Sequence, residues 1–163
     1  MAKRFFLIDG LSQIFRCYYA PFQNLSTPAG EPIKATYVFS NMLLQLIREQ
    51  KPDYLAMVME GGDEKDVFRK ELDPKYKANR EPPPEDLAPQ IERILQIIRS
   101  QGIPVLSVPG FEADDVLATL ATRLAGEDLE IVMVSRDKDL DQLVTGQVRL
   151  YDPMKNEFIG PRE

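Results

Sequence analysis

The sequence predicts an α/β fold with a central, mostly parallel sheet and helices on both faces. Short, uninterrupted apolar runs recur along the chain, as expected for strands that are buried on both faces. Longer segments with apolar residues at helical spacing separate most of these runs, which is typical of βαβ units. The length of 163 residues and the hydrophobic content of 44% suit one domain with a sizeable core, so we expect residues 1–163 to form a single domain.

Each expected element has its own signal in the sequence. Five apolar runs bounded by charged or turn residues are expected to be strands, at 4–9, 54–60, 103–108, 130–135 and 148–152. Three segments have apolar residues at helical spacing, at 34–50, 84–102 and 112–124. Gly102 is the last residue of the second segment and Gly126 lies shortly after the third, where a glycine commonly ends a helix.

Residues 61–84 do not fit the alternation of strands and helices. This segment has two glycines at one end, three prolines at the other, and little apolar periodicity. Between Lys75 and Arg80 every charged residue is a cation, and Tyr76 lies among them. A connection this long inside an α/β domain is usually functional or disordered. We therefore expect a long basic loop here, with a solvated loop as the alternative.

The composition excludes several kinds of chemistry. The chain has no histidine, which excludes Ser-His-Asp catalysis and histidine-bound zinc. Cys17 is the single cysteine, so the chain has no partner for an internal disulfide. Any metal must therefore be held by oxygen, which favours Mg²⁺, Mn²⁺ or Ca²⁺. No stretch has the length of a membrane span or the pattern of a signal peptide, so we expect a cytoplasmic protein with no membrane partner.

Acidic residues stand at several expected strand ends and at the start of one expected helix. In a parallel sheet these positions share one edge, so the side chains are expected to converge there. Clustered carboxylates repel one another unless they bind cations or take up protons. Two divalent ions held by oxygen are a standard apparatus for cleaving phosphodiesters. The set comprises Asp9, Glu60, Glu112, Asp114, Asp115, Asp137 and Asp139.

Each acid also has a structural explanation. Acids are favoured in the first turn of a helix, which applies to the start of 112–124. Asp137 is a candidate N-cap for the turn that follows it, with Asp141 on the outside of that turn and Leu140 inside. Asp152, at the end of the last expected strand, is expected to be solvated. The net charge of −6 argues against a nucleic-acid partner, but it would be about +1 without the seven acids.

Several stretches together resemble a known family. They include "FFLIDGLSQIFRCYYA", "FRKELDPKYKANREPPPEDL", "GFEADDVLATLA" and "VSRDKDLDQLV". In this combination the chain resembles the bacterial 5′-nuclease, flap endonuclease-like domain found at the N-terminus of DNA polymerase I and in separate exonucleases. The resemblance implies a PIN-like, three-layer fold. It also implies metal-dependent hydrolysis of DNA, or of RNA in DNA duplexes, from 5′ ends or at flaps.

The resemblance also implies roles for individual residues. Six of the acids match metal ligands of the family, and Glu60 falls where the family has aspartate; the ions would be two Mg²⁺ or Mn²⁺. Lys77 and Arg80 would be catalytic and contact phosphate near the scissile bond, while Tyr76 would stack on a displaced base. Arg16 and Arg69 would be further phosphate contacts. The implied partners are DNA with 5′ ends or flaps and a polymerase domain in the parent chain, and the protein is expected to be a monomer.

The sequence departs from the family pattern in three places. Glu60 replaces aspartate, and Arg136 replaces the glycine of a "T-G-D-K-D" pattern. The given sequence ends before the family's C-terminal helix–hairpin–helix-type module, so we expect either a fragment or a shortened protein, with weak or no activity of the chain alone. These departures leave open a catalytically degraded module that binds nucleic acid or metal. A PIN-type ribonuclease is a further alternative, whereas the long basic loop argues against a phosphoacceptor receiver-like domain.

Overall fold

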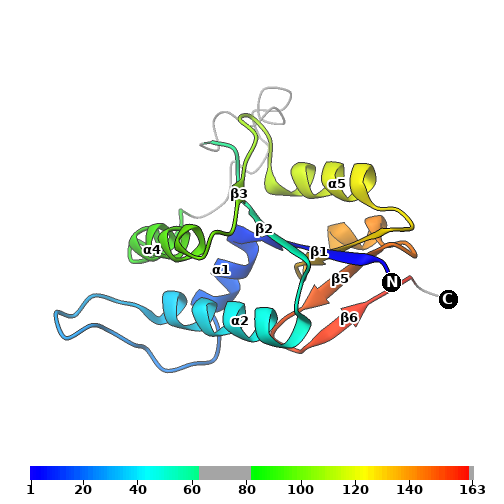
Figure 1. Ribbon diagram of the computed structural model, residues 1–163. Coiled ribbons are helices and arrows are strands. Elements are labelled where there is room, and N and C mark those ends of the chain that lie inside the picture. Colours follow the sequence, from blue (N-terminus) through cyan, green and yellow to red (C-terminus); the bar gives the residue numbers. More distant parts are fainter. Residues whose placement is uncertain (63–81, 162–163) are drawn as a thin grey trace.

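The computed structural model describes residues 1–62 and 82–161, and these residues form a sheet with helices on both of its faces (Figure 1). Six strands lie in the order β3-β2-β1-β4-β5-β6. The predicted α/β class with a mostly parallel sheet is confirmed. Most of the expected basic loop, with Arg69, Tyr76, Lys77 and Arg80, lies outside the described residues.

Five strands run parallel, and a sixth, antiparallel strand forms one edge of the sheet. The parallel strands are β1 (Lys3–Asp9), β2 (Tyr54–Val58), β3 (Val105–Leu106), β4 (Leu129–Val134) and β5 (Val148–Asp152). The sequence did not predict β6 (Glu157–Ile159), which pairs antiparallel with β5. The expected strands at 54–60 and 103–108 were too long. The chain leaves the sheet after Val58 and after Leu106, so Glu60 lies two residues beyond the end of β2.

Three helices lie within the expected helical segments, and a further α-helix and a 3₁₀ helix are additional. They are α1 (Gly10–Tyr18), α2 (Lys34–Gln50), α4 (Leu87–Ser100) and α5 (Ala113–Leu124), and a 3₁₀ helix, η2, spans Lys138–Leu143. The bounds of α2 match the expected segment, and Gly102 follows α4 with a φ of 74°. The sequence did not predict α1, which begins at the residue directly after β1.

The two faces of the sheet have separate hydrophobic cores. Phe6 and Ile8 of β1 pack with α1, α2 and α4 on one face, whereas Leu7 packs with α5 and η2 on the other. All three side chains are fully buried, in agreement with the apolar run at 5–8 within β1. Cys17 is free and fully buried on the first face, and burial raises the pKa of its thiol to about 12. In the described ranges no helix has the length and apolar character needed to cross a bilayer.

The order of the strands determines where a ligand site is expected. From β1 the chain adds β2 and then β3 on one side, and later adds β4 and β5 on the other side. The direction of winding therefore reverses between β1 and β4. In open parallel sheets, ligands bind beyond the carboxyl ends of the strands at such a reversal. Asp9 ends β1 there, and Ser135 follows β4.

Candidate metal centre

Asp9 is the most buried acid of the predicted set, with 3% of its surface exposed. Burial raises the pKa of its carboxyl to about 7. A hydrogen bond from Ser135 opposes this shift, and the nearby charges of Asp114, Asp137 and Glu60 add to it. These three acids come from α5, from the segment after β4 and from the segment after β2. The structure therefore brings acids from three other segments close to the end of β1.

Ser135 is a site residue that the sequence reasoning missed. Its hydroxyl is fully buried, donates to Asp9 Oδ2 at 2.8 Å and accepts from the backbone N–H of Asp137 at 3.1 Å. One side chain thus connects the end of β1 to the segment after β4, across the reversal. The available signal was a hydroxyl residue directly after the apolar residues 131–134, at the end of the expected strand 130–135.

Asp137 is the N-cap of η2, as the structural explanation of this acid predicted. Its Oδ1 accepts a hydrogen bond from the backbone N–H of Asp139 at 3.0 Å, at the start of η2. Leu140 is buried beneath this turn and Asp141 is partly exposed, as expected. A carboxylate has lone pairs to spare after accepting one such bond, so the cap and a metal role are compatible.

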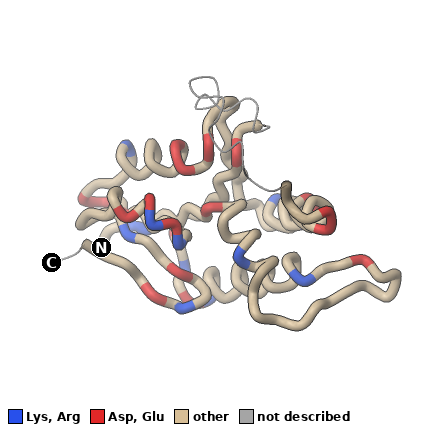
Figure 2. The backbone as a smooth tube through the Cα atoms, turned by 180° about the vertical axis from the view of Figure 1, so that it is seen from behind, with Lys and Arg blue, Asp and Glu red and all other residues tan. Residues whose placement is uncertain are grey.

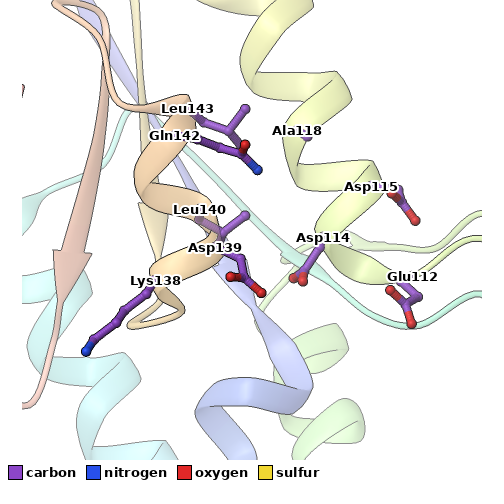
Figure 3. A pocket seen from close by; sticks show the side chains of 9 residues that line it. All are labelled: Glu112, Asp114, Asp115, Ala118, Lys138, Asp139, Leu140, Gln142 and Leu143. Atoms are coloured by element: carbon purple, nitrogen blue, oxygen red, sulfur yellow. The ribbon is translucent and has the colours of Figure 1, made fainter. Parts of the chain in front are cut away.

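An open pocket of about 500 Å³ lies between α5 and η2. The carboxylates of Asp114 and Asp139 point toward one another across it, whereas Asp115 points away from Asp139 (Figure 3). Lys138 extends away from these two carboxylates. The residues that line the pocket are Glu112, Asp114, Asp115, Ala118, Lys138, Asp139, Leu140, Gln142 and Leu143.

Glu60 lies beside the start of α5. Its Oε2 accepts a hydrogen bond from the backbone N–H of Ala113 at 3.0 Å. Ala113 is the first residue of α5, and Glu112 before it is 7% exposed. The acid that follows β2 is therefore in direct contact with the helix that carries Asp114 and Asp115.

Asp152 is paired rather than solvated, so the expectation for this residue was wrong. Its carboxylate, 3% exposed, accepts two hydrogen bonds from the guanidinium of Arg16, at 2.6 and 3.1 Å. The Nε of Arg136 lies 4.0 Å from the same carboxylate. Burial favours the neutral form of Asp152, but the hydrogen bonds and charge of Arg16 outweigh it and hold the pKa below its ordinary value. Two arginines thus share one acid at the carboxyl end of β5.

The change Asp152→Asn is expected to lower the free energy of unfolding at pH 7 by about 2 kcal/mol. It leaves the partly buried charge of Arg16 without its counterion. Because the folded-state pKa of Asp152 is depressed, this stability is present above the unfolded pKa of about 3.9 and is lost as the pH falls through the folded pKa. Urea unfolding at several pH values should show the difference from wild type shrinking below about pH 4. Asp128→Asn, at an exposed acid, should change stability little; an equal loss in both variants would contradict the role of the pair.

The acidic side chains form an open set of oxygen donors and not a complete, preformed metal-binding cage. Such an open set suits hard divalent ions. Acidic positions gather at the start of α5 and at the strand ends beside it (Figure 2). In the residues that the structure describes, no three acidic side chains already form a metal-ligating group. Mg²⁺ keeps several waters and takes only one or two carboxylates directly, so an open set of oxygen donors around a buried aspartate fits it.

The fold and the site together define the class of protein. A parallel α/β sheet with acids gathered at its winding reversal is an architecture suited to metal-dependent cleavage of phosphodiesters. Over residues 4–163 the chain matches the family model described as "5′-3′ exonuclease, N-terminal resolvase-like domain". The chain belongs to this family, as the resemblance in its sequence implied.

Curated relatives include polymerases and a separate exonuclease. DNA polymerase I of Rhizobium leguminosarum is 40% identical over 162 residues, which cover 95% of this chain and 16% of the polymerase. The 5′-3′ exonuclease of Aquifex aeolicus is 37% identical over 155 residues, which cover 95% of this chain and 53% of the exonuclease. The chain therefore spans about half of this exonuclease and about a sixth of the polymerase.

Solved structures from bacteriophage T5 share the fold. The T5 5′-exonuclease with bound zinc superposes with a TM-score of 0.67 at 20% identity, over 97% of this chain and 58% of that one. The T5 flap endonuclease in a pseudo-enzyme–product complex with DNA and metal ions gives 0.65 at 19% identity, with the same coverage. At this identity the likeness confirms the PIN-like, resolvase-like fold.

Proposed function

We propose that this domain hydrolyses phosphodiester bonds of DNA, at 5′ ends or at flaps, with Mg²⁺ or Mn²⁺. The observation that carries the proposal is the buried carboxylate of Asp9, which has acids from three other segments around it. A site of this kind is costly unless a cation or protons offset the repulsion. Family membership and the metal-bound T5 structures support the same reaction.

Six acids are proposed to hold two ions, which would activate water and stabilise the leaving oxygen. Residues of this chain orient the acids: Ser135 restrains the carboxylate of Asp9, and the cap at η2 restrains Asp137. Asp114 and Asp139 approach the pocket from opposite sides. The proposed ligands are Asp9, Glu112, Asp114, Asp115, Asp137 and Asp139.

Cations are proposed to bind the DNA. Arg16 and Arg136 lie together at Asp152, beside the end of β5, and the guanidinium of Arg136 is the more exposed of the two. Backbone phosphates are bound by such groups. The remaining proposed contacts are in the segment from Arg69 to Arg80: Arg69, Lys77 and Arg80 on phosphate, with Lys77 and Arg80 catalytic, and Tyr76 stacked on a base.

Partners and location follow from the same proposal. Several relatives are polymerases that carry a matching segment, so a polymerase domain in the same polypeptide is one proposed partner, besides DNA with a 5′ end or flap. We also propose that the protein acts as a monomer in the cytoplasm.

The natural gene product, incubated with a 5′-flap DNA or a 5′-recessed duplex, should release short 5′ fragments in Mg²⁺ or Mn²⁺ and none in EDTA. The folded state should be checked by circular dichroism in the same buffers. A folded protein that cuts neither DNA with either ion would contradict the proposal. Preferential cutting of an all-RNA strand would identify the ribonuclease alternative instead.

One observation favours a second candidate, a module that binds nucleic acid without cutting it. Arg136 places a cation directly before Asp137, one of the proposed ligands, and its Nε lies 4.0 Å from Asp152. A positive charge beside the proposed ligands would weaken the binding of a metal ion. Flap DNA that binds with a strong salt dependence but is never cut would identify this module. The variant Arg136→Gly would then be expected to restore cleavage.

A further inference from the structure

The helix α5 begins without a cap from its own segment. Glu112 occupies the N-cap position, and its side chain makes no capping hydrogen bond. The first backbone N–H groups of a helix have no partner within the helix, so an outside acceptor stabilises them. Glu60 supplies this acceptor, because its Oε2 lies 3.0 Å from the nitrogen of Ala113.

Backbone hydrogen bonds hold the two segments together on either side of this contact. The N–H of Met59 donates to the carbonyl of Leu106 at 2.8 Å, and the N–H of Gly61 donates to the carbonyl of Phe111 at 3.1 Å. The N–H of Gly110 donates a hydrogen bond to the carbonyl of Gly61 at 3.3 Å. The segment after β2 therefore follows the segment that leads into α5, and it delivers Glu60 to the first turn of that helix.

The length of the glutamate side chain matters for this contact. An aspartate at the same position would withdraw its carboxylate by about one carbon–carbon bond, or about 1.5 Å. That would lengthen the 3.0 Å contact to Ala113 beyond hydrogen-bond range, unless the backbone moved. The backbone bonds at Gly61 oppose such a movement.

We propose that Glu60 is a positioning residue that fixes the start of α5 through its hydrogen bond to the backbone of Ala113. Its carboxylate is held by the helix that carries Glu112, Asp114 and Asp115, and it thereby sets the direction in which these acids face the pocket. The glutamate side chain is longer than the aspartate of the family pattern, and this length allows the contact with Ala113. The link to metal binding depends on the proposed function, whereas the capping of α5 does not.

Two conservative variants separate positioning from ligation. Glu60→Gln keeps the length and the oxygen acceptor but removes the negative charge; Glu60→Asp keeps the charge but shortens the reach. If Glu60 positions α5, Glu60→Gln should bind Mn²⁺ within about threefold of wild type, and Glu60→Asp should bind about tenfold more weakly, as for other residues that orient metal ligands. If Glu60 is a ligand, the order reverses, because an amide is a poor substitute for a carboxylate on a hard ion.

Hydrogen exchange supplies a readout that does not depend on metal. Without added metal, the amides at 113–116 should exchange faster in Glu60→Asp than in wild type and at an unchanged rate in Glu60→Gln. Glu127→Gln, which removes a charge from an exposed acid before β4, controls for charge and should match wild type in both assays. Unchanged exchange in Glu60→Asp, or the reversed order of Mn²⁺ affinity, would overturn the proposal. A wild-type protein that binds no Mn²⁺ would instead contradict the proposed function, and the exchange result would still test the role of Glu60.

Discussion

In the natural gene product, the variant Asp114→Ala is expected to cleave flap DNA at least about 100-fold more slowly than wild type, at saturating Mg²⁺ or Mn²⁺. Asp114 faces Asp139 across the pocket and lies close enough to Asp9 to raise its pKa. Metal stabilisation of a phosphodiester transition state is worth several kcal/mol, and each 1.36 kcal/mol corresponds to a factor of ten in rate. Single-turnover cleavage of a 5′-labelled flap, with Mn²⁺ binding measured by calorimetry, checks the result.

The matched control for this loss is Glu127→Ala. It removes the same charge from an exposed residue before β4, away from the carboxyl ends of the strands. We expect its cleavage rate to stay within about twofold of wild type, since surface charges far from a site contribute little. If Asp114→Ala retained wild-type cleavage while remaining folded, the acids on α5 would not belong to the reacting site.

The variant Gly61→Ala is expected to lower the free energy of unfolding by about 3 kcal/mol, the upper part of the range for overpacking a close contact. A Cβ built on Gly61 would overlap the backbone carbonyl of Val108, and a backbone atom cannot rotate away as a flexible side chain can. The segments after β2 and before α5 would have to separate, and with them the hydrogen bond between Glu60 and Ala113. Thermal unfolding should show a midpoint lower by about 6–12 °C, given the usual 2–4 °C per kcal/mol for a domain of this size.

Gly146→Ala is the control for this variant. A Cβ at Gly146 meets no heavy atom within 4 Å, and its φ is not in the left-handed region. Its unfolding midpoint should therefore stay within about 2 °C of wild type or rise slightly, because alanine reduces the freedom of the unfolded chain. Equal losses in the two variants would show that the contact between Gly61 and Val108 is not tight.

The sequence was informative where one local pattern determined the structure. The segment 34–50 has continuous helical spacing, and α2 has those bounds. The buried strand β1 also followed directly from its apolar run. Helix α1 was missed because it starts at the residue after β1, with no turn residues between strand and helix to separate the two patterns. The strand β6 has three residues, too few for any periodicity to be recognised.

At the candidate site, the sequence predicted which acids share an edge but not which partners hold them. The pairing of Arg16 with Asp152 joins residues 136 positions apart, and no local pattern records such a contact. The hydrogen bond from Ser135 to Asp9 likewise depends on the order of β1 and β4 in the sheet. The contact between Glu60 and the start of α5 could not be predicted from a local pattern either. It depends on where the chain leaves the sheet after β2. Residue types thus indicated the chemistry, while the topology determined the contacts.

The lengths of the outermost strands affect how this sheet can meet other chains. The edge strands are β3, with two residues, and β6, with three, and they are shorter than every other strand of the described sheet. A short edge offers few unpaired N–H and C=O groups to an incoming strand, which is a common protection against aggregation. Recognition by strand addition is disfavoured for the same reason. A partner of this domain is therefore expected to contact the edges of the sheet through side chains.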